Sequence, residues 1–284
     1  MKDTFFCSEF YLSIEGISRK FDSPLVMGIV NCTPDSFYAG SRSESEQESL
    51  KMVEKMVEEG VDIIDLGAYS SRPGAPEVSE TEELNRLLPS LEAIRHRFPQ
   101  VLISVDTFRS KVAEEALERG VHLINDISAS KLDEKMLDVI SKYQANYIMM
   151  HMRGTPQNMQ SQVDYDDLVG EIQDYFSKQI SSCQKKGIEN LILDPGFGFS
   201  KTLEQNYELM NQLEQLHSLN HPILVGISRK SMIYKLLKKE ASEVLNATSA
   251  LHLLALSKGA HILRVHDVAE AKEIIKISAA LATH

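Results

Sequence analysis

Cysteine is scarce in this chain of 284 residues. Its three cysteines, Cys7, Cys32 and Cys183, are odd in number, lie far apart and form no CxxC pair. A disulfide framework and a zinc site are therefore not expected, and a reducing, cytoplasmic compartment fits this usage. Cys32 follows the first predicted strand, where we expect a small buried thiol in preference to a reactive group.

Long apolar runs and excess positive charge are also lacking. No run approaches the roughly 18 apolar residues that cross a bilayer, and residues 1–10 have no signal-peptide pattern. The net charge of −11 argues against nucleic acid or anionic membranes as partners, because basic patches carry those interactions. We therefore expect small-molecule substrates, and an anionic one would need a local cluster of Lys, Arg or metal.

The chain does have a recurring pattern of short apolar runs that end in a polar residue. Such runs end at Asn31, Asp106, Asn125, His151, Asp194, Ser228 and His266. A strand of this kind has a buried body and a chemically reactive end. Because the carboxyl ends of the strands meet at one face of a barrel, the pattern predicts an enzyme site built from many strand ends.

The apolar runs alternate with amphipathic segments of helical period. Strands are expected at residues 25–31, 61–66, 101–107, 122–127, 147–151, 191–194, 223–228 and 262–265. Helices are expected at residues 46–59, 82–98, 109–119, 132–142, 165–186, 203–216, 231–238, 246–258 and 268–280. About eight even βα units favour a single (β/α)8 TIM barrel, an α/β fold, over an open doubly wound sheet.

We expect one domain over residues 1–284. Residues 25–284 would form the barrel, and residues 1–24 a short N-terminal β-hairpin that covers its bottom. The loops at 31–45 and 67–79 are long and rich in Ser, Gly and Pro. Long ordered loops at this end of a barrel are usually lids or binding loops, so both are expected to contact the substrate.

Eight segments at the strand ends form a joint pattern. They are MGIVNCTPDSF (27–37), DLGAYSSRPGA (65–75), SVDT (104–107), NDIS (125–128), MHMRGTP (150–156), LDPGFGF (193–199), GISRKS (226–231) and RVHDV (264–268). In this order they resemble the motifs of the dihydropteroate synthase family, which are pterin-binding TIM barrels. The resemblance covers nearly the whole chain.

The resemblance implies a transferase of folate biosynthesis. Its reaction would condense 4-aminobenzoate with 6-hydroxymethyl-7,8-dihydropterin diphosphate to 7,8-dihydropteroate and diphosphate. The resemblance also implies Mg²⁺ as cofactor, a homodimer, and an enzyme of the class that sulfonamides target.

A pterin presents an amino group and ring N–H donors side by side, which a buried carboxylate accepts in charge-assisted pairs. Asp106 and Asp194 are suited to this role, and Asn125 both donates and accepts. The alternative is that a strand-end Asp only caps the next helix. The resemblance assigns to the pterin pocket Asp106, Asn125, Ile127, Met149, Asp194 and Lys230.

Diphosphate needs positive charge and hydrogen-bond donors. The resemblance assigns this role to Asn31, Ser71, Arg264 and His266. Arg264 and His266 are two residues apart, so their side chains point to the same side of a strand. Mg²⁺ takes few protein ligands and keeps several waters. Asn31 is the expected metal ligand, with Asp35 in the same loop.

The resemblance also implies a site for 4-aminobenzoate. It assigns to this site Phe37, Arg72, Pro73, Phe199, Lys230 and Ser231. Ser231 is predicted to open a helix, where free N–H groups face an anion. The residues expected to take part in catalysis are Lys230, Arg72, Asp106 and Asp194.

The reaction path is expected to be dissociative, because the nitrogen lone pairs of a dihydropterin delocalise a developing cation. Mg²⁺ and cationic side chains would stabilise the departing diphosphate. A covalent nucleophile is then not needed, which fits the lack of an activated Ser or Cys constellation.

Two positions depart from the family pattern. Tyr69 stands where many members have glutamate, and Ser200 where glycine is frequent. One alternative function is a pterin-dependent methyltransferase, which needs a corrinoid partner and no diphosphate site. The other is a non-catalytic pterin-binding barrel, which would be expected to lose polar strand ends. The pairs Arg264/His266 and Lys230/Ser231, together with residues 71–73, argue against the methyltransferase. The presence of every polar strand end argues against the non-catalytic barrel.

Overall fold

The computed structural model describes residues 9–32, 42–69 and 78–282, with residues 42–45 described by their backbone alone. Its main sheet has eight strands in the order β8-β7-β6-β5-β4-β3-β10-β9. The strands are β3 (Leu25–Asn31), β4 (Ile63–Gly67), β5 (Leu102–Asp106), β6 (Leu123–Asp126), β7 (Asn146–Met150), β8 (Leu191–Asp194), β9 (Leu224–Val225) and β10 (Ile262–Val265).

The sheet closes on itself between β8 and β9. Leu193 and Ile223 form a parallel bridge there, and the Leu193 amide donates to the Pro222 carbonyl over 2.9 Å. A ring of parallel strands inside a layer of helices is a (β/α)8 barrel. The predicted fold class is confirmed, and an open doubly wound sheet is excluded.

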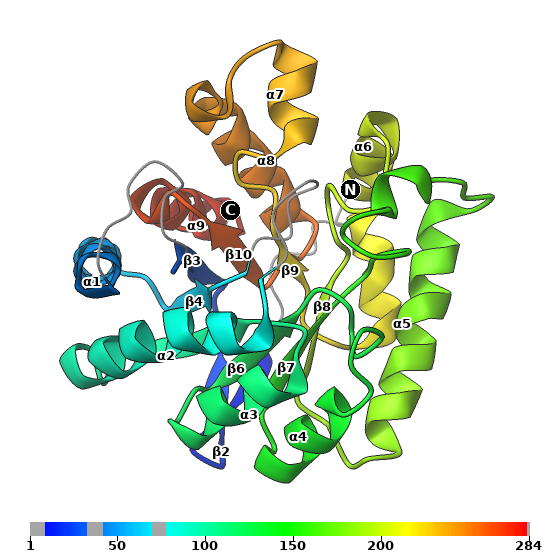
Figure 1. Cartoon of the computed structure of the whole chain (residues 1–284). Coiled ribbons are helices and arrows are strands. Elements are labelled where there is room, and N and C mark those ends of the chain that lie inside the picture. The colour runs from blue at the N-terminus through cyan, green and yellow to red at the C-terminus, as the bar shows by residue number, and fades with distance from the viewer. Residues whose placement is uncertain (1–8, 33–41, 70–77, 283–284) are drawn as a thin grey trace.

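Helices surround the strands on the outside of the barrel (Figure 1). They are α1 (Arg42–Glu58), α2 (Glu80–Arg97), α3 (Ser110–Glu118), α4 (Met136–Tyr143), α5 (Leu168–Gln184), α6 (Leu203–Asn211), α7 (Ser231–Leu237), α8 (Leu245–Ser257) and α9 (Val268–Ala282). Within the described ranges, no helix is both long enough and apolar enough to cross a membrane.

Several element boundaries differ from those predicted. The strand expected at 223–228 pairs only at Leu224–Val225, because the chain then turns. The helix expected at 132–142 begins at Met136. Asp133 accepts from the amides of Ser110 (2.8 Å) and Lys135 (3.0 Å), which fixes a turn before that helix. The helix expected at 203–216 ends at Asn211 and is followed by a 3₁₀ helix, Leu213–Leu219.

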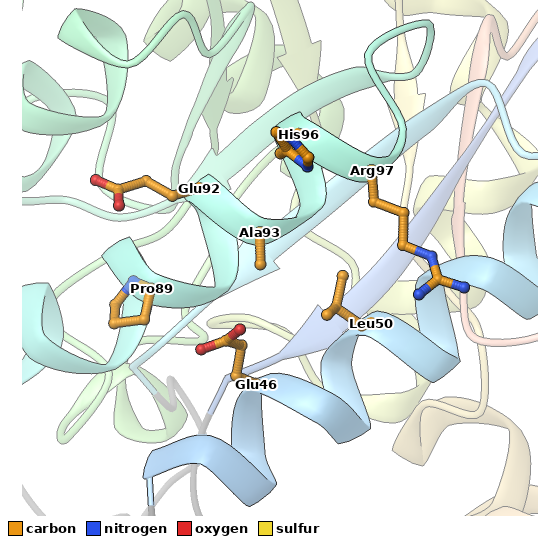
Figure 2. Close-up of a pocket in the computed structure, with 7 residues that line it drawn as sticks. All are labelled: Glu46, Leu50, Pro89, Glu92, Ala93, His96 and Arg97. Atoms are coloured by element: carbon orange, nitrogen blue, oxygen red, sulfur yellow. The ribbon is translucent and has the colours of Figure 1, made fainter.

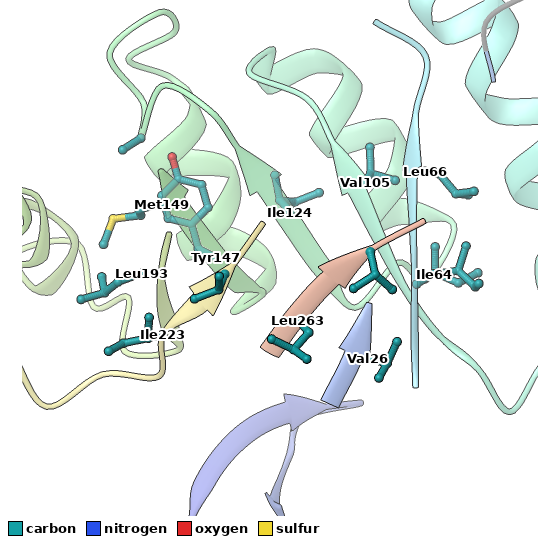
Figure 3. Close-up of a cluster of buried hydrophobic side chains, with 14 of the residues drawn as sticks. Val26, Ile64, Leu66, Val105, Ile124, Tyr147, Met149, Leu193, Ile223 and Leu263 are labelled. Atoms are coloured by element: carbon teal, nitrogen blue, oxygen red, sulfur yellow. The ribbon is translucent and has the colours of Figure 1, made fainter. Parts of the chain in front are cut away.

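Alternate strand residues face the helices and form an apolar layer, here called the outer core (Figure 3). Its members include Val26, Ile64, Leu66, Val105, Ile124, Tyr147, Met149, Leu193, Ile223 and Leu263. Burial of these side chains against the helices supplies the main driving force for folding. The other face of each strand points into the barrel.

The lower end of the barrel interior is also apolar, and a hairpin covers it. Strands β1 (Phe10–Ile14) and β2 (Ile17–Phe21) pair antiparallel. The buried residues of this lower layer are Phe10, Leu12, Ile14, Leu25, Met27, Ile63, Leu123, Ile148, Ile192, Leu224 and Ile262. The Asn146 side chain accepts from the Ser13 amide (2.8 Å) and donates to the Ser13 carbonyl (2.7 Å). The predicted hairpin is therefore confirmed.

Candidate active site

Above the lower layer, the interior positions of the strands carry polar side chains. Arg264 on β10 donates from Nε to Asp65 Oδ2 on β4 (2.6 Å) and from Nη2 to Asp106 Oδ2 on β5 (2.7 Å). Asn125 on β6 donates to the same Asp65 oxygen over 3.1 Å. These four residues, here called the arginine cluster, connect four strands across the barrel.

The arginine cluster places two carboxylates around one guanidinium. Asp65 is fully buried, and its Oδ1 has no hydrogen-bond partner within the described ranges. Burial raises the pKa of Asp106 to about 7, with Arg264 opposing the rise and Asp65 adding to it. The Asp106 side chain keeps 24% of its surface exposed, whereas Asp65 keeps none. Asp106 is thus the carboxylate of the cluster that a molecule in the barrel mouth can contact.

A second pair of charged groups lies at the end of β8 and after β9. Asp194 is 5% exposed, and its Oδ1 accepts from the Gly196 amide over 2.8 Å. Lys230 Nζ donates to the Phe197 carbonyl over 2.6 Å. Burial raises the pKa of Asp194, and Lys230 opposes that rise. Burial also lowers the pKa of Lys230 to about 8, against the effect of Asp194. Each charge therefore favours the ionised form of the other.

Two glycines show that these groups face one space. A Cβ added at Gly226 would lie 3.9 Å from Lys230 Nζ and 4.0 Å from Arg264 Cδ. A Cβ added at Gly67 would lie 3.6 Å from Asp106 Cβ and 3.9 Å from Asn31 Oδ1. Since Arg264 also bonds to Asp106, the side chains of Asn31, Asp106, Arg264 and Lys230 form one continuous surface.

One wall of this space is apolar. Its buried residues are Ile127, Met150, Met152 and Met159, against which Phe108 and Phe199 pack. Lys230 Nζ lies 4.8 Å from the centroid of the Phe199 ring, within cation–π range. An apolar wall beside carboxylates suits a flat ring that carries hydrogen-bond donors on one edge.

The rim of the space carries His266 and Ser231. His266 is exposed, and its Nδ1 lies 3.1 Å from the Ser228 Oγ, which therefore orients the ring. Ser231 is half-buried and is the first residue of α7. His266 follows β10, and Ser231 follows the turn after β9.

The sequence matches a family model described as pterin binding enzyme over residues 27–266. Dihydropteroate synthase from Escherichia coli K12 is 45% identical to the chain over 268 residues, which is 94% of each protein. The chain belongs to the dihydropteroate synthase family. Dihydropteroate synthase from Synechocystis is 44% identical over 259 residues, covering 90% of this chain and 89% of that protein.

Solved structures of dihydropteroate synthases share the whole fold. The Yersinia pestis enzyme in a sulfonamide complex has a TM-score of 0.90 and 41% identity, covering 97% of this chain and all (100%) of that one. The Xanthomonas albilineans enzyme with 4-aminobenzoic acid has a TM-score of 0.89 and 35% identity, covering 98% and 100%. These likenesses extend the family relationship from the sequence to the barrel and its strand ends.

The residues predicted for the dihydropteroate synthase site fall into three groups. The structure brings together Asn31, Asp106, Asn125, Ile127, Asp194, Phe199, Lys230 and Arg264, with Ser231 and His266 at the rim. Phe37, Ser71, Arg72 and Pro73 lie outside the described residues, as does Asp35. Met149 forms the third group by itself.

Met149 does not join this cluster. It is fully buried in the outer core, where its Sδ lies 3.6 Å from the Cys183 Sγ of α5 (Figure 3). Side chains alternate along a strand, so Met149 and Met150 point to opposite faces of β7. Met150 pairs with Asp194 in register and packs in the apolar wall. The structure therefore offers Met150, and not Met149, to a ligand in the barrel.

Asp65 is the residue that the sequence prediction missed. It lies inside the apolar run 61–66, one residue before the end of that run, whereas the prediction considered only strand ends. A signal was present, because a carboxylate within a strand of a buried barrel requires a partner. That partner is Arg264. The two residues are 199 positions apart in the chain, so their pairing is visible only in the folded barrel.

Cys32 lies beyond β3 but belongs to the outer core and not to the site. Its side chain is 1% exposed and carries a free thiol. Burial raises its pKa, with hydrogen bonds from Ser90 and Ser49 opposing the rise, so the unreactive thiol form is favoured. The predicted buried thiol is confirmed.

A surface groove lies between α1 and α2, on the outside of the barrel (Figure 2). It is lined by Glu46, Leu50, Pro89, Glu92, Ala93, His96 and Arg97. None of the residues predicted for substrate binding lines it. The groove is therefore separate from the candidate active site.

Proposed function

We propose that the barrel mouth condenses 4-aminobenzoate with 6-hydroxymethyl-7,8-dihydropterin diphosphate, forming dihydropteroate and diphosphate. The observation that carries the proposal is the convergence of the arginine cluster with Lys230 and the apolar wall. Family membership and the solved relatives support it. One of those relatives, from Clostridium difficile, was solved with pteroic acid and is 38% identical with a TM-score of 0.86.

The pterin is proposed to bind deepest in the barrel. Asp194 and Asp106 would accept from its amino and ring N–H groups, and Asn125 would complete the edge. The unpartnered Oδ1 of Asp65 supports this placement, because a buried acceptor without a donor is costly unless a ligand or water supplies one. Ile127 and Met150 would contact the ring faces.

The diphosphate is proposed to bind toward the rim. Arg264 lies in β10, and His266 directly follows that strand and is exposed. Asn31 is also exposed, and a Cβ added at Gly67 would lie 3.9 Å from its Oδ1 and 3.6 Å from the Asp106 Cβ. Ser71, outside the described residues, would add a hydroxyl donor.

Mg²⁺ fits the donor set at this point. It prefers oxygen ligands and retains several waters, so a single amide oxygen with carboxylates nearby is a sufficient protein contribution. Asn31 would hold the ion, and Asp35 would be near it in the same loop. When bound, the ion would supply charge neutralisation for the departing diphosphate.

Catalysis is proposed to rest on electrostatics and positioning. The carboxylates of Asp106 and Asp194 favour positive charge that develops on the pterin. Lys230 contacts the pterin edge and the Phe199 ring, and Arg264 and His266 favour the negative charge that leaves. A dissociative path needs no nucleophile from the protein, and Cys32 is turned away in the outer core.

The 4-aminobenzoate is proposed to bind last. Phe199 would contact its ring, with Lys230 and Ser231 near its far end. Phe37, Arg72 and Pro73, which lie outside the described residues, would complete the site. We propose that the diphosphate substrate binds first, since it adds charge and contacts to the site at which the amine then binds.

One assay tests the proposed function. Dihydropterin diphosphate and Mg²⁺ are supplied with and without 4-aminobenzoate, and diphosphate release is measured. Release that depends on the amine is expected. Pterin binding without turnover would instead indicate a non-catalytic barrel, and methyl transfer with a corrinoid protein would indicate the methyltransferase.

The chain is also proposed to form a homodimer through its C-terminal helices. Large apolar side chains are exposed on α7 and α9: Leu236 (53%), Leu237 (44%), Ile277 (49%) and Leu281 (56%). Exposed large apolar side chains of this kind are typical of an interface. Sedimentation velocity should give a dimer mass, and replacing Ile277 and Leu281 by Glu should give a monomer. A cytoplasmic location is proposed as well, because Cys32 and Cys183 are free thiols.

A further inference from the structure

Lys201 is a buried lysine next to the candidate active site, and the proposed function gives it no role. Only 4% of its surface is exposed. Its Nζ donates to the carbonyls of Gly196 (3.0 Å) and Phe199 (3.1 Å) and lies 3.1 Å from His151 Nδ1. Among the described residues it forms no ion pair with a carboxylate. Lysine is almost never buried without a partner, so these contacts call for an explanation.

The contacts of Lys201 join the end of β7 to the turn after β8. That turn, residues 195–200, has left-handed φ at Gly196 (+71°), Gly198 (+82°) and Ser200 (+43°). A Cβ at Gly196 would lie 2.1 Å from the His151 carbonyl oxygen, so the two segments touch at their backbones. Lys201 supplies the donor for two carbonyls of this turn, those of Gly196 and Phe199, and buried carbonyls require such a donor.

The same turn holds three groups of the candidate site. The Gly196 amide donates to Asp194 (2.8 Å), the Phe197 carbonyl accepts from Lys230 (2.6 Å), and Phe199 itself stands beneath the Lys230 ammonium. A shift of the turn would therefore move a carboxylate, a ring and an ammonium group together. Misplacement by about 1 Å can reduce a catalytic rate by about a hundredfold.

We propose that Lys201 is a positioning residue, which holds the 195–200 turn against His151 so that Asp194, Phe199 and Lys230 keep the geometry that binds the pterin. The proposal rests on the proposed function only where it predicts an effect on kcat. Lys201 does not touch the substrate, and its effect passes through the turn.

The contact set of Lys201 is satisfied in either charge state. As an ammonium it donates to both carbonyls and to an unprotonated His151 Nδ1. As an amine it donates to both carbonyls and accepts from a protonated Nδ1. Burial lowers the pKa of Lys201 to about 7, against the effect of Asp194, and burial also holds the pKa of His151 well below its usual range. The hold on the turn therefore does not require a buried positive charge.

Two substitutions separate positioning from simple stabilisation. Lys201→Met keeps the apolar stem and removes every donor, whereas Lys201→Gln keeps a shorter amide that can reach one carbonyl. Lys185→Met is the matched control, because Lys185 is exposed after α5. Affinity for pteroic acid is measured by calorimetry at 25 °C on folded protein, together with kcat, both KM values and Tm.

The proposal predicts a graded loss. Pteroic acid should bind about tenfold more weakly to Lys201→Met, equivalent to about 1.4 kcal/mol, and about threefold more weakly to Lys201→Gln. The kcat should fall in the same order, and Lys185→Met should match the wild type. If either Lys201 variant is folded, less stable and unchanged in affinity and kcat, Lys201 is structural only and the proposal is overturned. Should the wild type release no diphosphate, the proposed reaction fails, while pteroic acid binding still decides the role of Lys201.

Discussion

The two ends of the barrel interior are built from the same strands and differ in almost every other respect. The lower layer is a cluster of buried apolar side chains that the hairpin closes. The upper positions, often only two residues further along the same strand, hold Asp65, Asp106, Asp194 and Arg264. Strand geometry therefore supplies stability at one end and a cluster of charged side chains at the other.

This contrast explains how burial can be used for chemistry. The lower layer gains free energy from apolar burial, which fixes the strands in position. The upper layer buries charged side chains. Their pKa values are shifted by the loss of solvation and by the charges of their neighbours. A rigid lower half lets the upper half keep charges that would be costly in a deformable site.

The largest expected effect comes from removing a carboxylate at the upper end. Asp194→Asn removes the charge but keeps the size of the side chain. Pterin affinity should fall at least about a hundredfold, because a charge-assisted pair is lost, as calorimetry with pteroic acid would measure. The Tm should stay within a few degrees, since burial already disfavours this carboxylate. Unchanged affinity would contradict the placement of Asp194 in the pterin pocket.

The next prediction breaks the pairing inside the arginine cluster. Arg264→Met leaves Asp65 and Asp106 without their cation, and breaking a buried ion pair costs about 3–5 kcal/mol. Urea unfolding at pH 7.5 should show this loss, together with a raised KM for the diphosphate substrate. The double variant Arg264→Met with Asp65→Asn is the control and should recover part of the stability. A single variant as stable as the wild type would rule out the paired cluster.

A substitution in the lower layer should reduce stability and leave substrate binding almost unchanged. Leu12→Ala opens a cavity under the barrel, and such truncations cost about 2–5 kcal/mol. Urea unfolding should show the loss, while both KM values stay within about twofold at 25 °C. Tyr11→Ala is the matched control in the same strand, because Tyr11 is exposed and should cost far less. A large KM effect from Leu12→Ala would show that the two ends are not independent.

A further prediction concerns pH. The carboxyl of Asp106, with its pKa raised to about 7, must be ionised to accept from the pterin, so kcat/KM should rise with pH through about 7. Lys230, with its pKa lowered to about 8, must keep its proton, so kcat/KM should fall again above about 8. The profile should be bell-shaped, and Lys230→Arg should remove the alkaline limb. A profile flat from pH 6 to 9 would contradict both assignments.

The smallest effect is expected at Cys32. Cys32→Ala removes a buried thiol from the outer core, and a cost of about 1 kcal/mol follows from the small volume lost. The kcat should be unchanged, although Cys32 lies next to Asn31 in the sequence. A large loss of activity with normal stability would mean that the thiol reaches the site.

The sequence was sufficient to predict the barrel, the hairpin and most of the strand-end residues. Hydrophobic period and polar strand ends are local properties, which a single chain displays directly. Which of two adjacent residues faces the barrel interior was harder to predict. The choice of Met149 over Met150 depends on which face of β7 enters the barrel, and the register with Asp194 settles it in favour of Met150.

Other features depend on contacts that sequence patterns do not display. Asp65 acquires its role only when β10 lies across the barrel from β4. Strand β9 pairs over two residues and not the six expected, because Gly226 and the turn before Lys230 end the ladder. The roles expected for Arg72, Ser71 and Phe37 stay predictions, since these residues lie outside the described part of the chain.

A crystal structure with bound pteroic acid tests the central claim most directly. The pterin should lie in the barrel mouth with its donor edge about 2.7–3.2 Å from carboxylate oxygens of Asp106 and Asp194, and with Met150 against its face. A pterin bound elsewhere, for example in the groove between α1 and α2, would contradict the account.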